Sequence, residues 1–402
     1  MNELLTLLAL LGAGVWLLRP KVTGSATWRA VGTPLASIIG SGFLVSTPIL
    51  SNLYGGWAVL AMAALLLVAY LVGAAVRENI LHVEPLLAQQ DGGGLIGSLE
   101  RLSHLVLAFA YFVSVAYYLV LFASFLLKPM GLHDLILVKT VVTLVLTVIG
   151  GIGLWRGFRA VEGMEIYVVS AKLAVIAGMM MGLFLYDVGL TVAPEGGSLL
   201  PVGHFDPASL PVLLGLLILV QGFETSRFLG NRYSPELRVR TMKIAQLLSA
   251  AIYLCFFLLM TPLFSKGTTG GDVAAVVDML GPVSFLLPLL VLAGALASQS
   301  SAAIADTLGA GGLVYNIAGS RIRMRHIYPL ICVVAGVITW ETHIYSLITF
   351  ASRCFAAYYG MQCLVAAISA AKRGRQARAS GFALLALFCV AIIVFGTPVE
   401  GG

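Results

Sequence analysis

Residues 38–45 read IIGSGFLV, which places Gly40, Ser41 and Gly42 in the middle of an apolar run. Glycine lowers helix propensity by about 1 kcal/mol per residue and lets the backbone open. In a membrane, an opened backbone is tolerated only where it packs on protein or lines a cavity. The stretch therefore indicates either a close contact between helices, made of small residues, or a break whose bare backbone groups bind a ligand.

The composition indicates a polytopic membrane protein built of helices. Hydrophobic residues make up 59% of the 402 residues and charged residues 10%, and the mean hydropathy is +0.99. Soluble domains carry roughly 45–50% and about 25%. In lipid every backbone group must be bonded within the structure, and the apolar runs are continuous rather than alternating, so helices are favoured over a β-barrel.

Twelve apolar runs are expected to form helices in one transmembrane domain covering 1–402. A short run within 1–26 forms an extra N-terminal helix that spans the membrane or lies in its interface. Two sets of five helices follow, within 27–187 and 209–371, and a last helix covers 379–396. The runs are 4–18, 31–52, 57–77, 103–127, 135–154, 164–187, 209–229, 241–264, 282–308, 327–341, 343–368 and 379–396.

The basic residues predict an orientation. If 19–30 lie in the cytosol and the helices are threaded in order, most of the 24 Lys and Arg residues fall on cytosolic segments. The net charge of +6 thus reflects membrane topology, and no nucleic-acid partner is expected. The location predicted is a bacterial or archaeal plasma membrane. The histidines and five cysteines lack metal-ligand spacing, and catalytic motifs are missing, so we expect no metal, no cofactor and no enzymatic activity.

A second interruption occupies the matching place in the second set of helices. Residues 220–226 read VQGFETS, with Gln221 and Gly222 followed by Glu224. Since each set has five helices, a repeat of the first set must run upside down, which is the inverted-repeat plan of many secondary transporters. Half-helix N-termini suit a carboxylate and exposed carbonyl ends suit a cation, so two matched breaks favour a binding site.

These motifs resemble the amino acid–polyamine–organocation (APC) superfamily, whose members have the leucine-transporter fold. The I-G-S-G signature with its apolar pair is matched at 39–44, the F-x-G-F-E pattern at 220–224 and, in part, the N-P-x-x-x-x-P pattern at 234–241. Val220 and Thr241 depart from the family pattern. The resemblance covers 27–370 and implies a 5+5 inverted-repeat fold of about 12 helices, counting the two extra ones.

The resemblance also implies a substrate site at the two breaks. The backbone of 39–42 would bind a carboxylate, and Gly222 and its neighbours an amino group. The substrate-binding residues expected are Ile39, Gly40, Ser41, Gly42, Gln221, Gly222, Phe223 and Tyr111. Aromatic residues on apolar faces are also common as plain packing.

Of the ionisable residues in the expected spans we single out four, because charges inside a membrane are functional candidates by default. By resemblance, Lys172 takes the place of a sodium ion and contacts the first broken helix and the eighth helix, where Ser298 and Ser301 are candidate partners. The alternative is a lysine that reaches the cytosolic interface. Glu224 matches a glutamate suspected of sensing protons, or forms an i,i+3 pair with Arg227.

The other two charges lie in the second half of the chain. Asp306 could neutralise Arg353 in a structural ion pair. Alternatively, Arg353 binds an anionic group of the substrate.

The function predicted is a secondary active permease for amino acids that works by alternating access. It would be sodium-independent, coupled to protons by symport or running as an antiporter, and would act as a monomer or homodimer in the lipid bilayer. The alternatives are a membrane amino-acid sensor of the same fold that does not transport, and a transporter of carboxylates, ions or other small solutes.

Overall fold

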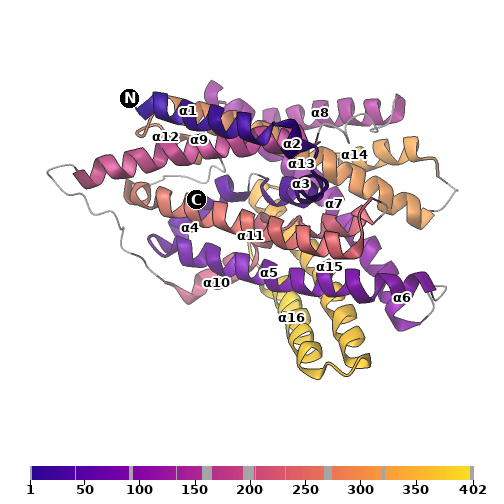
Figure 1. Cartoon of the computed structure of the whole chain (residues 1–402). Coiled ribbons are helices and arrows are strands. Elements are labelled where there is room, and N and C mark those ends of the chain that lie inside the picture. The colour runs from indigo at the N-terminus through magenta and orange to yellow at the C-terminus, as the bar shows by residue number, and fades with distance from the viewer. Residues whose placement is uncertain are drawn as a thin grey trace.

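The computed structural model describes the chain as an assembly of helices (Figure 1). The residues described are 2–40, 42–89, 94–132, 134–155, 165–192, 203, 205–230, 232–266, 274–318 and 322–398. Ser41, one of the expected binding residues, lies outside them.

The first half of the chain forms one extra helix and then five spans, the first of which is interrupted. Its helices are α1 (Asn2–Leu17), α2 (Pro20–Thr23), α3 (Ala26–Ile38), α4 (Gly42–Tyr54), α5 (Ala58–His82), α6 (Glu84–Gln89), α7 (Leu95–Leu127), η1 (Lys128–Met130), α8 (Leu135–Trp155) and α9 (Glu165–Val192).

The second half again begins with an interrupted span and ends in one extra helix. Its helices are η2 (Pro207–Ser209), α10 (Leu210–Leu214), η3 (Leu217–Val220), η4 (Phe223–Leu229), α11 (Pro235–Met260), η5 (Thr261–Lys266), α12 (Val276–Leu280), α13 (Leu286–Ala318), α14 (Met324–Glu341), α15 (Ile344–Lys372) and α16 (Gln376–Phe395). The η elements are 3₁₀ helices.

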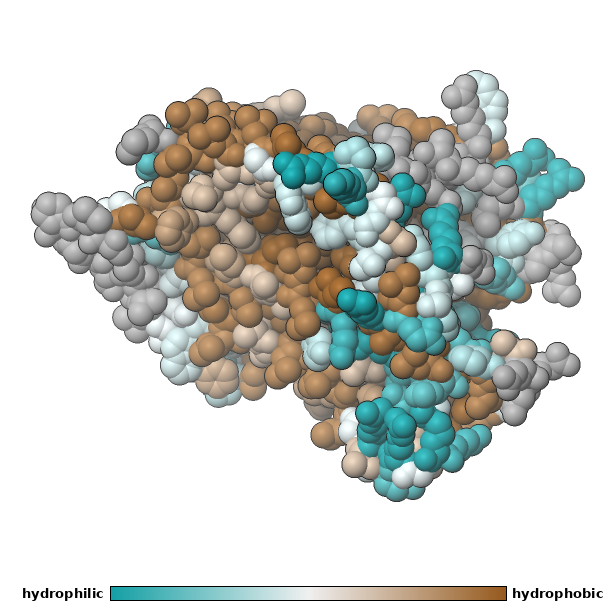
Figure 2. Space-filling view, in the orientation of Figure 1, coloured by the Kyte–Doolittle hydropathy of each residue, from teal (hydrophilic) through white to brown (hydrophobic). Residues whose placement is uncertain are grey.

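The all-α membrane class predicted from composition is confirmed. Among the described residues, nine helices are long and apolar enough to cross a membrane. Hydrophobic side chains cover the middle of the visible surface, whereas hydrophilic ones gather at the end near α6 and at the turn between α15 and α16 (Figure 2). This distribution fits a protein whose middle contacts lipid and whose ends face water.

The two sets of five helices pack into one another. α13 and α15 of the second set lie against α7 of the first, and α11 lies against α3 and α5. The two extra helices stay outside this bundle, since α1 packs on α9 and α16 packs on α15 (Figure 1). The interrupted helices are therefore enclosed, while the added helices cover outer faces.

Several helices extend further than the apolar runs indicated. α7 begins at Leu95 rather than 103, α11 begins at Pro235 rather than 241, and α13 continues to Ala318 rather than 308. The hydropathy pattern missed the starts of α7 and α11 because they carry charged residues. Two of these, Glu100 and Arg238, are buried and satisfied by partners on other helices.

The N-terminal run forms α1, which lies antiparallel to α9. A Cβ on Gly178 would meet the Cβ of Leu10 at 2.9 Å, and one on Gly182 would meet the Thr6 hydroxyl at 3.1 Å. Glycines four residues apart let two helix backbones approach closely in a membrane. The small residues of α9 therefore position α1.

Candidate functional site

The two interruptions predicted from the sequence are present. α3 ends at Ile38 and α4 begins at Gly42, and the sixth span is divided at Gln221 and Gly222 between η3 and η4. Gly222 has a φ of +115°, a left-handed conformation that L side chains rarely adopt. This sixth span is more irregular than expected, because its pieces are a single α-helical turn and two 3₁₀ segments.

The interruptions contact each other and run antiparallel. A Cβ on Gly42 would lie 2.2 Å from the Leu219 carbonyl oxygen, and a Cβ on Gly222 would lie 2.5 Å from the Ser37 hydroxyl. As residue numbers rise along one break they fall along the other, which is the geometry of an inverted repeat. The interpretation of the opening glycines as a close contact between helices is therefore confirmed, because their small size permits the contact that holds the breaks together. Ligand binding by the bare backbone of the break stays a prediction.

Tyr253 of α11 joins the two breaks. Its hydroxyl lies 2.9 Å from the Ile38 carbonyl oxygen and 2.8 Å from that of Leu219, and the whole side chain is buried. Helix ends leave carbonyls without intrahelical partners. A single phenolic proton is shared between these two acceptors, so Tyr253 stabilises both ends at once.

Lys172 of α9 points to the first break. The residue is 3% exposed, and its Nζ donates to the Ala36 carbonyl oxygen at 3.0 Å. The amide that would normally bond this carbonyl is that of Gly40, where the helix is interrupted. The side chain therefore does not reach for the membrane interface.

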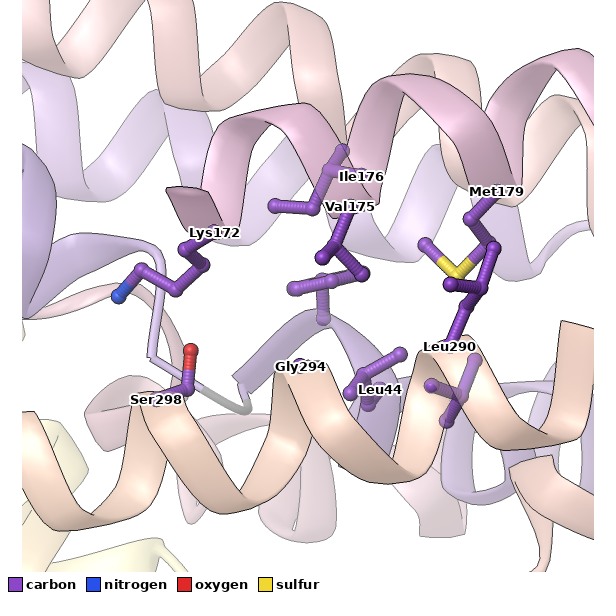
Figure 3. Close-up of a pocket in the computed structure, with 10 residues that line it drawn as sticks. Leu44, Lys172, Val175, Ile176, Met179, Leu290, Gly294 and Ser298 are labelled. Carbon is purple, nitrogen blue, oxygen red and sulfur yellow. The ribbon is translucent and has the colours of Figure 1, made fainter. Parts of the chain in front are cut away.

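Ser298 of α13 borders the same pocket as Lys172, together with Phe43, Leu44 and Gly294 (Figure 3). Its hydroxyl donates weakly to the Ile39 carbonyl at 3.4 Å. The space has room for about one water molecule. Ser301 instead bonds the Ser298 carbonyl of its own helix, which is the common behaviour of serine in membrane helices.

Glu224 is fully buried and accepts three hydrogen bonds. The Tyr359 hydroxyl donates to Oε2 at 2.7 Å, the Gly222 amide to Oε2 at 3.0 Å and the Tyr111 hydroxyl to Oε1 at 3.4 Å. The alternative expectation of an i,i+3 pair with Arg227 is wrong, because no such ion pair exists between these two described residues. Glu224 instead connects the second break to α7 and α15.

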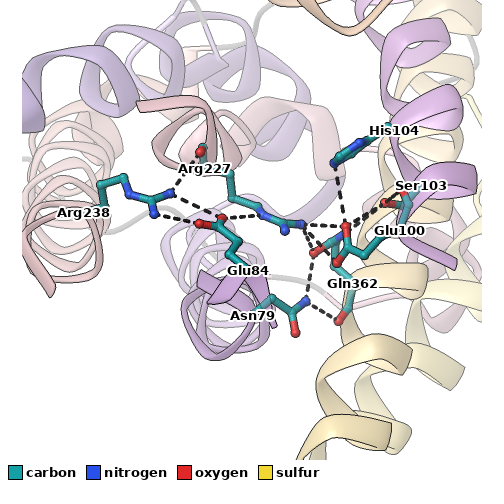
Figure 4. A network of polar contacts seen from close by, with 8 residues as sticks. All are labelled: Asn79, Glu84, Glu100, Ser103, His104, Arg227, Arg238 and Gln362. Atoms are coloured by element: carbon teal, nitrogen blue, oxygen red, sulfur yellow. Dashed lines mark hydrogen bonds and ion pairs between the residues drawn. The ribbon is translucent and has the colours of Figure 1, made fainter. Parts of the chain in front are cut away.

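Arg227 belongs to a separate polar network (Figure 4). Its guanidinium lies 3.3 Å from Glu84 and 3.2 Å from Glu100, and Arg238 binds the other Glu84 oxygen at 2.6 Å. Gln362 of α15 also bonds Arg227 and receives a hydrogen bond from Asn79 at 2.8 Å. The network connects η4 with α5, α6, α7, α11 and α15 at the end of the molecule near α6.

The expected ion pair between Asp306 and Arg353 is wrong. Asp306 of α13 is 1% exposed and accepts a hydrogen bond from Ser114 of α7. Arg353 of α15 donates to the carbonyl of Gly396, just past the end of α16, at 2.6 Å. The two side chains belong to different interfaces, so the spacing of charges along the sequence did not reveal their partners.

The remaining predicted residues lie at the two breaks. Phe223 stacks on Tyr359 with ring centroids 4.9 Å apart, and the Gln221 amide donates to Tyr118 at 2.8 Å. Gly40 lies against the Tyr118 ring, where a Cβ would be 3.6 Å away. Sequence reasoning missed Tyr253 and Tyr359, whose only signal was a phenol within an apolar span.

The charged and polar residues around the breaks offer hydrogen bonding and proton binding rather than metal coordination. Among the described residues, no group of three or more His, Cys, Asp or Glu is placed to hold a metal ion.

Comparison with known proteins gives relatives along nearly the whole chain. The sequence profile of a family described as an APC superfamily transporter matches residues 20–396. An uncharacterized protein of Aquifex aeolicus (strain VF5) is 37% identical over 391 residues, which are 96% of this chain and 95% of that protein.

A solved transporter with low sequence identity shares the fold of this chain. A substrate-bound, outward-open Na⁺-coupled sialic acid symporter is 13% identical, with 99% of this chain and 98% of that chain covered and a TM-score of 0.54. A manganese transporter from Eremococcus coleocola is 14% identical, with coverage of 92% and 87% and a TM-score of 0.48. The likeness to the symporter agrees with the fold class expected from the sequence.

Proposed function

Because the chain belongs to the APC superfamily of transporters, we propose that it carries amino acids across a prokaryotic plasma membrane by alternating access. The substrate would bind where the two interrupted helices meet, halfway across the bilayer. Transport would not need sodium, and would be coupled to protons or run as exchange. In the proposed orientation, the loops rich in Lys and Arg face the cytosol.

The observation that carries this proposal is the contact between Lys172 and the carbonyl of Ala36. A buried ammonium at a helix's interrupted C-terminal end supplies the positive charge that a bound cation would otherwise supply there. Ser298 of α13 donates to another carbonyl of the same break, that of Ile39. Sodium would have to compete with a charge that is already in place.

The hydrogen-bonding groups at the breaks fit a small zwitterion. The N-terminal end of α4 favours a carboxylate through its aligned peptide dipoles. Glu224 and the hydroxyls around it place acceptors beside the second break, where an ammonium would be favoured. Arg353 is engaged by the carbonyl of Gly396, and this disfavours the alternative that it selects an anionic substrate.

The test is uptake of a labelled amino-acid panel into proteoliposomes, with and without sodium and with and without a pH gradient. We expect uptake of one or more amino acids in sodium-free buffer. Lys172→Ala should abolish it, because the carbonyl end of α3 loses its cation. Lys139→Ala is the matched control, since that lysine also bonds a backbone carbonyl, that of Trp340, but on an exposed face of α8.

Two results would contradict the proposal. A sodium requirement in the wild type would show that the Lys172 ammonium does not replace the ion. Absence of uptake for every amino acid, in protein that is folded and correctly inserted, would remove amino acids as the substrate class.

A further inference from the structure

Asp306 is a buried carboxyl group that neither the proposed transport site nor the Arg227 network uses. It lies in α13 at the interface with α7, and 1% of it is exposed. Its Oδ2 accepts the hydrogen bond from Ser114, but its Oδ1 has no hydrogen-bond partner. No ion pair to Asp306 exists within the described parts of the chain, so its charge is not neutralised there.

Glu224 provides an internal comparison, because it is a second buried carboxyl in the same region. Three donors reach its two oxygens, which stabilises the anion. Asp306 has one donor and one bare oxygen. An ionised carboxylate with a bare oxygen inside a membrane protein is strongly disfavoured, and a proton on that oxygen removes the buried charge, which is the larger part of the penalty.

The two carboxyls are connected through one turn of α7. Tyr111 contacts Glu224 and Ser114 contacts Asp306, and these positions three residues apart share one helix face. Like charges in a low-dielectric interior disfavour each other's ionised form. Because three donors stabilise the anion of Glu224 and only one stabilises that of Asp306, Asp306 is the member of the pair that takes the proton more readily.

The other titratable groups near Asp306 do not supply a counter-charge. Tyr111 and Tyr118 of α7 are phenols, and both lie within electrostatic range of Asp306 and Glu224. The ammonium of Lys172 bonds the first break and lies in the pocket beside Ser298. Ser298 is eight residues from Asp306, which is about 12 Å along α13.

We propose that Asp306 is the proton-carrying residue of the transport cycle, and that it binds its proton on Oδ1 in the conformation described here. The proton comes from water on one side of the membrane and forms an O–H bond with the carboxylate. When α7 and α13 move apart and water reaches the site, that bond breaks and the proton leaves to water on the other side. No electron transfer is involved. The inference rests on the proposed transport function.

The first test measures proton binding without any substrate. Infrared difference spectra between acidic and alkaline membranes should contain the carbonyl stretch of a protonated carboxyl group, and Asp306→Asn should remove it. The control is Asp278→Asn, which removes an exposed carboxylate paired with Lys128 and should leave the band unchanged. Asp306→Glu should keep the band at a shifted frequency. This second variant keeps the test valid if the asparagine variant folds poorly. A band that persists in Asp306→Asn overturns the assignment.

The second test measures coupling in proteoliposomes, using the best-transported amino acid of the panel. A pH gradient should drive accumulation by the wild type and by Asp278→Asn. In Asp306→Asn this accumulation should be lost while counterflow at equal pH continues, because counterflow needs no net proton transfer. Loss of both modes would make Asp306 a substrate contact and overturn the proposal.

The outcomes separate this inference from the proposed function. Gradient-driven accumulation that survives in Asp306→Asn, or a wild type that exchanges amino acids without any response to pH, overturns only the assignment of Asp306. A wild type that moves no amino acid, but whose infrared band depends on Asp306, overturns only the choice of substrate.

Discussion

Replacing Gly42 by alanine should damage both folding and transport, because the added methyl group has no space. The new Cβ would lie 2.2 Å from the Leu219 carbonyl oxygen, 3.0 Å from the carbon of that carbonyl and 2.7 Å from the Tyr253 hydroxyl. Two of these atoms belong to the backbone of the other interrupted helix. Relief therefore requires the two breaks to separate or Tyr253 to move.

The free-energy change follows from two parts. Overpacking of a dense interior typically destabilises a protein by about 1–3 kcal/mol. Displacing Tyr253 would leave a buried carbonyl without its donor, which destabilises by about 1–3 kcal/mol more. We therefore expect a loss of roughly 2–6 kcal/mol in the free energy of unfolding, the sum of those two ranges, against ordinary stabilities of about 5–15 kcal/mol.

The assay is equilibrium unfolding in mixed micelles with increasing denaturing detergent, together with amino-acid uptake. Gly312→Ala is the matched control, since it changes a helical glycine of α13 that has open space around its Cβ position. Gly94→Ala tests backbone strain alone, because Gly94 has a φ of +94° and the added methyl group would meet no atom within 4 Å. If Gly42→Ala unfolds like Gly312→Ala and transports normally, the close contact between the breaks is refuted.

Three other substitutions test neighbouring parts of the site. Tyr253→Phe removes the bridging hydroxyl and should lower the free energy of unfolding by about 1–3 kcal/mol, measured by the same unfolding assay; unchanged stability would mean that the two carbonyls do not depend on it. Arg227→Gln leaves Glu100 buried without its cation and should destabilise by about 3–5 kcal/mol. Arg378→Gln removes an exposed arginine while Arg373 still pairs with the same Glu78, and it should change stability by no more than about 1 kcal/mol. Arg353→Gln should leave the order of preferred substrates unchanged in competition uptake, because its guanidinium binds a backbone carbonyl; a shift away from anionic substrates would contradict this.

Local signals in the sequence were sufficient to predict the interruptions. Glycine next to a polar residue inside an apolar run is unfavourable for a continuous helix whatever surrounds it, so residues 40–42 and 221–222 marked the breaks. The odd number of spans in each set then implied inversion, and the antiparallel contact of Gly42 with Leu219 agrees with it. The interruptions could be predicted from short stretches of chain, and the inversion from the number of spans in each set.

Side-chain partners could not be predicted in the same way, because they depend on which helix faces which. Arg227 lies three residues after Glu224, yet it bonds residues more than one hundred positions away, such as Glu100. A sequence shows directly only which residues are neighbours on one helix, three or four positions apart. In η4 the 3₁₀ geometry changes even that spacing. The expected pair of Asp306 and Arg353 failed for a similar reason, since both were treated as unpaired charges in lipid.

The side chains that bond the first break show how it is held. A backbone interrupted inside a membrane needs its freed carbonyls satisfied from other helices. Lys172 from α9, Tyr253 from α11 and Ser298 from α13 each donate to a carbonyl of the first break. Because three helices share the task, movement of any one of them changes the hydrogen bonding of the break. If the breaks bind the substrate as proposed, a change there can be transmitted to α9, α11 and α13 through these hydrogen bonds, which is the coupling that the proposed alternating access requires.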